Sequence, residues 1–260
     1  MNKTKIEWCD STWNPVTGCL HGCPYCYARN ITHRFGFRID ADPGHGWGDR
    51  QRVGKECECN TLHILRKKTE NSYPYGFDPT FHKYRLDEPQ RIKKPQNIFV
   101  CSMADLFGAF IPDEWIQEVF QACEKAPQHR YLFLTKNPER YIELSKKGLL
   151  PSHSNFWFGT SVTDQETPHF WSTYLNTFIS IEPLLNEFHK CDSEIKAGWV
   201  IAGAETGNRK GKIIPKREWI ENIVNECRRA KVSVFLKNSL ASIYGEPLIQ
   251  EYPWEAKSDN

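Results

Sequence analysis

From about residue 97 onward, short apolar runs alternate with longer stretches in which apolar side chains recur on one side. The short runs are apolar at consecutive positions, which is typical of parallel strands that are covered on both faces or line a barrel. They predict strands at Asn97–Ser102, Tyr131–Thr135, Phe156–Ser161, Thr177–Ile181, Trp199–Gly203 and Val232–Leu236, with a further strand near Trp13–Gly18.

The stretches between these runs predict helices. One-sided apolar stripes indicate helices over Asp113–Ala126 and Arg217–Ala230. Asn137–Pro138 is a typical helix start, Gly148 closes that helix, and Thr167–Pro168 repeats the start signal.

Repeated alternation of strand and helix predicts an α/β fold with a parallel sheet. About six to seven strands suit a partial (β/α) barrel better than a flat sheet. Residues from about 40 to 95 have scattered glycine, proline and charge with little periodicity, which predicts a long irregular insertion. We therefore expect one domain over residues 1–260 that carries this insertion.

Composition narrows the class of protein. Hydrophobic residues make up 39% and charged residues 25% of the chain, as in an ordinary globular protein. The net charge of +2 favours no partner by itself. Met1–Asp10 has no apolar run of the signal-peptide kind, and no stretch approaches the roughly 18 apolar residues of a membrane span. We expect a cytoplasmic protein with no membrane contact, in which the ten cysteines stay reduced.

Three of these cysteines form a compact motif. Residues Gly18–Ala28 read Gly-Cys-Leu-His-Gly-Cys-Pro-Tyr-Cys-Tyr-Ala, so that Cys19, Cys23 and Cys26 follow the spacing C-x3-C-x2-C. Soft thiolates select iron–sulfur clusters, zinc or copper(I). Three thiolates on one loop can hold three corners of a 4Fe-4S cluster. Without a fourth cysteine, one iron keeps an open position at which a small molecule can bind.

The main alternative is a structural zinc site. Cys9 or His21 would then supply the fourth ligand, or Cys57 and Cys59 would supply a second cysteine couple. Zinc sites usually pair one close couple of ligands with a second couple further along, and the single-residue spacing of Cys57 and Cys59 is tight for this role. The spacing therefore favours the cluster.

The cysteine loop, with the aromatic Tyr25 just before its third cysteine, resembles the signature of the radical S-adenosylmethionine superfamily. The whole chain also resembles a phage-associated family of uncharacterised proteins that carry this three-cysteine loop. The matching segments are Ile6–Trp8, Trp13–Cys19, Ser102–Phe107, Leu134–Lys136, Ser180–Leu185 and Gly203–Gly207.

The resemblance implies a mechanism and its cofactors. Cys19, Cys23 and Cys26 would hold a 4Fe-4S cluster whose open iron chelates the methionine part of S-adenosylmethionine. An electron from a reductase or a flavodoxin-like donor would cleave the cofactor and give a 5′-deoxyadenosyl radical. Tyr25 would lie against the adenine, or alternatively pack beside the cluster. The Gly-Gly-Glu turn of the superfamily is missing, and its counterpart is expected at Cys101–Met103 or in the insertion.

Polar residues end most of the predicted strands. In parallel (β/α) folds such residues gather in one cavity. We expect Lys136 or Ser161 to contact cofactor carboxylate or ribose, as Ser102 would at the turn, and Glu182 and Glu205 to bind an amino group, a ribose or the substrate. A helix cap or a salt bridge is the alternative for each. The full set is Cys101, Ser102, Thr135, Lys136, Thr160, Ser161, Thr163, Glu182, Glu205, Lys237 and Asn238.

Cys101 is a separate candidate because a thiol beside a radical centre can donate a hydrogen atom. A buried free cysteine that packs as a small hydrophobe is the favoured alternative. We expect Cys101, Lys136 and Glu182 to be the catalytic candidates.

Residues Gly207–Arg217 contain five basic and no acidic side chains. This loop follows a predicted strand and precedes a predicted helix, so it could clamp a phosphate, although a solvated loop is the alternative. Together with the phage association, it makes a nucleic-acid base or nucleotide the expected substrate class. The competing function is a non-catalytic zinc or iron–sulfur protein that binds nucleic acid or a protein partner.

Overall fold

The computed structural model describes residues 1–35, 62–163, 166–188, 195–207 and 209–255. Its main sheet contains β1 (Asn2–Lys3), β2 (Ser11–Trp13), β6 (Asn97–Val100), β7 (Arg130–Thr135), β8 (Phe156–Ser161), β9 (Asn176–Ile181), β10 (Trp199–Ala202) and β11 (Ser233–Leu236). A small second sheet contains β3 (Val16–Thr17), β4 (His63–Leu65) and β5 (Thr80–His82). The helices are α1 (Tyr27–Phe35), α2 (Asp113–Glu124), α3 (Glu139–Lys146), α4 (Arg217–Arg229) and α5 (Ala241–Tyr244), with short 3-10 turns η2 (Lys83–Arg85), η3 (Pro89–Arg91) and η4 (Asn238–Leu240).

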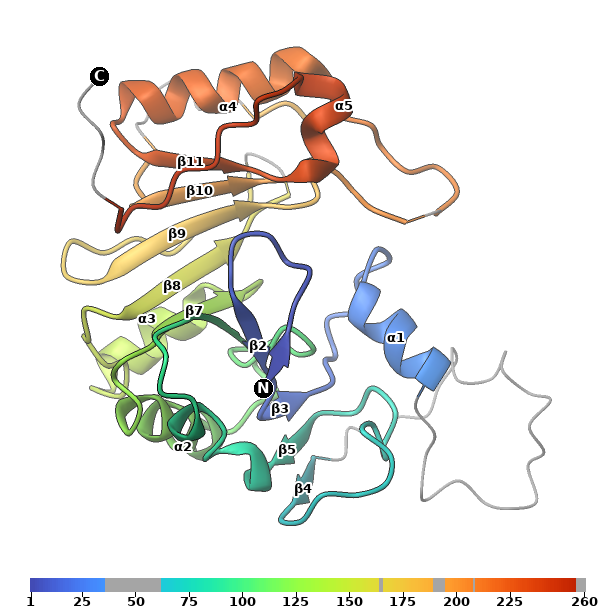
Figure 1. Cartoon of the computed structure of the whole chain (residues 1–260), viewed down its shortest axis with the longest axis vertical. Coiled ribbons are helices and arrows are strands. Elements are labelled where there is room, and N and C mark those ends of the chain that lie inside the picture. Colours follow the sequence, from blue (N-terminus) through green and yellow to red (C-terminus); the bar gives the residue numbers. More distant parts are fainter. Residues whose placement is uncertain (36–61, 164–165, 189–194, 208, 256–260) are drawn as a thin grey trace.

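Seven parallel strands form the main sheet in the order β2-β6-β7-β8-β9-β10-β11, and β1 pairs antiparallel with β2 at one edge. Strands that follow one another in the main sheet are also neighbours in space. Each connection therefore advances the chain by one position, and the sheet curves into half a barrel (Figure 1). This confirms the predicted partial barrel of parallel strands.

The two faces of the curved sheet are covered differently. Helices α2, α3 and α4 pack on the outer face, where alternate strand residues such as Phe133 and Val200 join the helix side chains in two buried clusters. The inner face carries Leu132, Trp157, Phe178, Trp199 and other large side chains. Segments from near both chain ends fill this concave side, as the blue N-terminal segment shows in Figure 1. Both faces are thus buried, which explains the continuous apolar runs.

The predicted strand near Trp13–Gly18 is divided in two. β2 joins the main sheet, whereas β3 turns away at Asn14–Pro15 and pairs antiparallel with β5. Proline has no N–H to donate to a ladder, and its carbonyl instead accepts from the backbone of His82 at 2.7 Å. The division frees the chain after β3 to begin the cysteine loop.

The described part of the expected irregular insertion contains regular structure. Its residues up to 61 lie outside the described residues, as do Cys57 and Cys59. From residue 62 it contributes β4 and β5, and Phe81 packs against Trp115 of α2 with ring centroids 5.2 Å apart. His82 is fully buried, its Nε2 lies 2.8 Å from Thr17 Oγ1, and burial lowers its pKa to about 3. This part of the insertion is therefore well packed, and it stabilises β3 through β5.

The prediction that a helix starts at Thr167–Pro168 is wrong. The described residues between β8 and β9 contain no helix. Phe170, two residues after Pro168, packs in the outer core, and its backbone N–H donates to Thr160 Oγ1 at 3.0 Å instead of to a helix carbonyl. A local start signal was overridden by the need to bury one aromatic ring. The other predicted helix starts agree with the structure to within a few residues.

Candidate three-cysteine site

The cysteine loop begins at Gly18, where the backbone has no room for a side chain. Gly18 has φ +85°, and a Cβ there would lie 2.2 Å from the carbonyl oxygen of Asp78. Its N–H donates to Met103 O at 2.9 Å, and the N–H of Cys19 donates to Phe77 O at 3.1 Å. The first cysteine is thus fixed between the segment after β6 and the small sheet.

The loop ends where α1 begins. Cys26 directly precedes α1, and its Sγ accepts the backbone N–H of Arg29 at 3.4 Å, in the manner of a helix-capping side chain. The positive end of the helix dipole favours negative charge at this position. Cys26 is therefore held at the start of α1 by a backbone contact of its own sulfur atom.

All three thiols are free and half-buried. Burial raises the pKa of Cys19 to about 12; a backbone hydrogen bond at His21 opposes this, and the charges of Asp105, Cys23 and Cys26 add to it. The three cysteines therefore lie within electrostatic reach of one another. In the described ranges, no three or more His, Cys, Asp or Glu side chains are grouped closely enough to hold a single metal ion.

The two side chains considered as a fourth zinc ligand have other contacts. Cys9 is buried in the inner-face cluster, where its Sγ lies 3.9 Å from Ile6 O. His21 Nε2 lies 2.8 Å from Asp105 Oδ2. Each of the two side chains thus already has a partner other than the three thiols.

Asp105 is the residue that ties the cysteine loop to the sheet. The residue is 6% exposed, and its side chain accepts from four groups. Oδ2 contacts His21 Nε2 and the N–H of Lys136, both at 2.8 Å; Oδ1 accepts from Thr135 Oγ1 at 2.7 Å and from the N–H of Phe107 at 3.0 Å. One carboxylate thus joins the cysteine loop, the turn after β6 and the carboxyl end of β7. It was missed in the sequence, where the only signal was an acidic residue inside the apolar segment Ser102–Phe107.

Replacing Asp105 with alanine is expected to lower the free energy of unfolding by about 3 kcal/mol, because several buried donors would lose their acceptor. Urea unfolding of the purified chain measures this loss. Asp87→Ala, which removes an exposed partner of Arg91, is the matched control and should stay within about 0.5 kcal/mol of wild type. A loss below about 1 kcal/mol for Asp105→Ala would contradict the assignment of Asp105 as a structural hub.

A second group of polar residues lies at the ends of β9, β10 and β11. Lys237 Nζ donates to Glu182 Oε1. Gly203 lies against this pair, since a Cβ on it would be 3.0 Å from Lys237 Cδ and 3.4 Å from Glu182 Cγ. The pKa of Tyr27, the first residue of α1, is raised mainly by burial of its hydroxyl and to a smaller extent by the charge of Glu182. The start of α1 and these strand ends therefore face the same space.

Lys136 and Tyr25, two residues predicted to contact the cofactor, lie together at the cysteine loop. The ammonium of Lys136 is 5.3 Å from the ring centroid of Tyr25. Ser161 ends β8 half-buried and is paired with Ser180 of β9. Ser102 is also adjacent, because its carbonyl accepts from Tyr27 Oη at 2.6 Å, while its hydroxyl donates to Asn14 Oδ1 at 3.2 Å.

Two other predicted residues are placed differently. Cys101 has φ +59° and is buried with Cys123 in the outer cluster, so its thiol packs in the helix-covered core, and burial raises its pKa to about 12. Glu205 forms a bidentate pair with Arg209, with Nε–Oε1 at 2.6 Å and Nη2–Oε2 at 2.7 Å. The packing and salt-bridge alternatives account for these two contacts.

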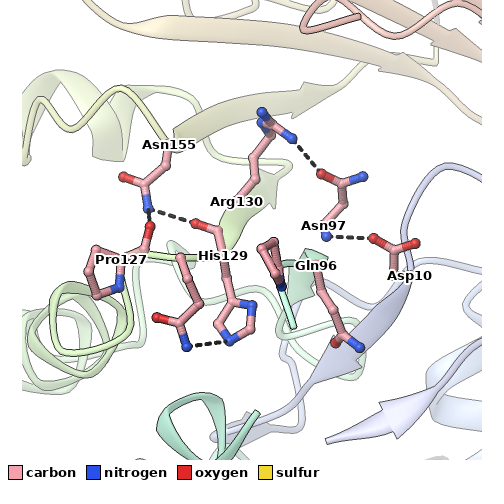
Figure 2. A pocket seen from close by; sticks show the side chains of 9 residues that line it. Asp10, Gln96, Asn97, Pro127, His129, Arg130 and Asn155 are labelled. Carbon is pink, nitrogen blue, oxygen red and sulfur yellow. Dashed lines mark hydrogen bonds between the residues drawn. The ribbon is translucent and has the colours of Figure 1, made fainter. Parts of the chain in front are cut away.

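A separate cavity of about 410 Å³ lies at the opposite, amino ends of the strands. Figure 2 shows Arg130 donating to Asn97, whose N–H donates to Asp10. The Arg130 guanidinium also lies 4.0 Å from the ring centroid of Trp254. In parallel (β/α) folds this end usually serves stability, and we assign these contacts to holding the edge of the barrel together.

The fold and the site together define an α/β half-barrel protein with a three-cysteine loop at the carboxyl ends of its strands, an arrangement compatible with a radical-S-adenosylmethionine-like fold. The chain belongs to the family described as protein of unknown function (DUF5131), which it matches over residues 3–243. No curated protein and no solved structure matches the chain. Among the described helices, none is both long and apolar enough to cross a membrane.

Proposed function

We propose that the protein is a radical S-adenosylmethionine enzyme. The observation that carries this proposal is the placement of three free, half-buried thiols on one loop at the carboxyl ends of a parallel half-barrel. Ligands gather at this end of such folds, and soft thiolates suit iron–sulfur clusters. Cys19, Cys23 and Cys26 would hold a 4Fe-4S cluster. The chemistry that this cluster supplies when bound is the one-electron reductive cleavage of S-adenosylmethionine.

The chain's own residues would orient the cofactor. Glu182 and Lys237 offer a paired carboxylate and ammonium, which match the amino and carboxylate groups of a methionine moiety in sign. Lys136 beside Tyr25 and the end of β8 at Ser161 offer contacts for carboxylate or ribose. The aromatic inner core closes the barrel beneath these groups and excludes water from that side. An external one-electron donor, such as a reductase or a flavodoxin-like protein, would complete the system.

The proposal is tested on the wild-type chain, reconstituted without oxygen. We expect about four iron and four sulfide ions per chain, and release of 5′-deoxyadenosine when dithionite and S-adenosylmethionine are added. Protein with an intact cluster that releases no 5′-deoxyadenosine would refute the enzymatic reading. Stoichiometric zinc in protein purified without oxygen would favour the alternative, a non-catalytic metal protein that binds nucleic acid or a protein partner.

A further inference from the structure

Two segments near the proposed site are basic and contain no acidic residue. Residues 18–35, which hold the cysteine loop and α1, include Arg29 and Arg34. Residues 206–217, which lead from β10 to α4, include Arg209, Lys210, Lys212, Lys216 and Arg217. The chain as a whole has 34 basic and 32 acidic side chains, so this separation of charge is local.

Both segments start from the same edge of the barrel. The α1 segment is fixed there by the hydrogen bond from Tyr27 to Ser102 O, at 2.6 Å, and lies within electrostatic reach of Glu182. The second segment leaves β10 through Gly203, which is packed against Glu182. In Figure 1, α1 and the orange loop before α4 project on the side to which the arrowheads of β8 and β9 point. The two basic segments therefore flank the mouth of the cysteine site.

Cationic groups in and beside the cysteine loop and α1 lie over aromatic rings. Lys136 Nζ is 5.3 Å from the Tyr25 ring centroid, Arg29 Cζ is 5.4 Å from that of Phe77, and Arg34 Cζ is 5.2 Å from that of Phe35. Phe35 is 64% exposed and Tyr27 is 49% exposed. Exposed rings combined with a basic surface are what unpaired bases need, since the rings stack on bases while the cations contact phosphates.

Three of the five cations of the second segment form ion pairs with acidic residues that are near in sequence. Glu205 neutralises Arg209, while Glu218 and Glu221 form exposed pairs with Lys216 and Arg217. Exposed pairs are weak and exchange readily with a stronger anion. Lys210 and Lys212 are exposed on the loop. This segment therefore presents several cations to an approaching phosphate chain.

We propose that residues 18–35, 206–207 and 209–217 form one surface that binds single-stranded nucleic acid across the mouth of the cysteine site. This inference rests on the proposed function, because it names a nucleic-acid base as the substrate class of the cysteine site. Binding itself needs no cluster and is measured separately. A duplex hides its base faces, whereas a single strand offers them to Phe35 and Tyr27.

The test is fluorescence anisotropy of a labelled mixed-sequence 12-nucleotide DNA or RNA with the full chain. Lys210→Ala/Lys212→Ala/Lys216→Ala is expected to weaken binding at least tenfold and to reduce the dependence of log affinity on log salt by about two, since each lost phosphate contact on a single strand contributes about 0.7. The matched control is Lys93→Ala/Lys94→Ala/Lys125→Ala, which removes three exposed lysines at the amino-end side of the sheet and should leave affinity within about twofold.

Phe35→Ala tests the stacking contribution and is expected to weaken oligonucleotide binding about fivefold or more without changing the binding of inorganic polyphosphate. Equal losses for the two lysine triples, or equal effects of Phe35→Ala on polyphosphate and oligonucleotide, would overturn the proposal. The proposal would also be overturned if the folded chain bound neither the DNA nor the RNA oligonucleotide at low salt, or if its basic segments bound only a protein.

The proposal and the proposed function can fail separately. Oligonucleotide binding by the full chain kept free of iron should match that of the reconstituted chain, because the proposed contacts are made by cations and aromatic rings. Binding that persists in a protein inactive toward S-adenosylmethionine would leave this surface standing and remove the radical chemistry. Release of 5′-deoxyadenosine from a protein that binds no nucleic acid would support the radical chemistry and remove the nucleic-acid-binding surface.

Discussion

Single replacement of Cys19, Cys23 or Cys26 by alanine is expected to lower iron from about four per chain to below about one and to abolish 5′-deoxyadenosine release. All three thiols are free and half-buried, and they share one loop. Two remaining thiolates cannot hold three corners of a cubane. Iron and sulfide analysis after reconstitution without oxygen measures the effect.

Buried cysteines elsewhere in the chain provide the control. Cys227 packs in the outer cluster with α4, and burial raises the pKa of its thiol to about 12, so Cys227→Ala should retain the wild-type iron content. Cys26→Ser separates folding from ligation, because serine can still cap α1 through the Arg29 N–H but is a poor cluster ligand. Wild-type iron in any of the three alanine variants, or equal loss in Cys227→Ala, would contradict the assignment.

Trp199→Ala is expected to lower the free energy of unfolding by about 4 kcal/mol, the usual range for removing a large buried aromatic side chain. Trp199 is fully buried at the centre of the inner face. Its ring lies within 6.3 Å of the ring centroids of Trp8, Phe178, Phe235, Tyr252 and Trp254. Its Nε1 donates to Glu251 O at 2.9 Å.

Urea unfolding with a fluorescence-independent probe, such as far-ultraviolet circular dichroism, measures this change. Tyr174→Ala removes a ring that is 90% exposed and should change stability by less than about 0.5 kcal/mol. Trp199→Phe should lie between the two, because it keeps most of the ring contacts but leaves the Glu251 carbonyl without its donor. A Trp199→Ala loss no larger than that of Tyr174→Ala would show that the inner face is not a packed core.

The parallel strands could be predicted because the sheet is buried on both faces. That burial turns each strand, such as Phe156–Ser161, into a continuous apolar run. The cysteine spacing also identified the loop itself, since Cys19, Cys23 and Cys26 lie together by chain connectivity alone. These features depend on local sequence and are readable without the fold.

The remaining features depend on contacts between distant residues. Asp105 gains its role from donors at His21, Thr135 and Lys136, and no local pattern brings those together. Burial of Phe170 removed a helix that local signals favoured. Glu205 is an exception, because its pair with Arg209 spans four positions and was within reach of sequence reasoning.

The filling of the concave face by distant segments has a consequence for synthesis. Glu7 accepts from the backbone N–H of Asn238 at 2.8 Å and from Tyr252 Oη at 3.1 Å, a contact that spans 245 positions. β11 ends at Leu236, so Tyr252 emerges from the ribosome only after every strand of the main sheet has been made, and the aromatic interior cannot close earlier. Pairings this remote slow folding and leave aggregation-prone intermediates. We therefore expect nascent chains of this protein to need chaperone protection until the interior is closed.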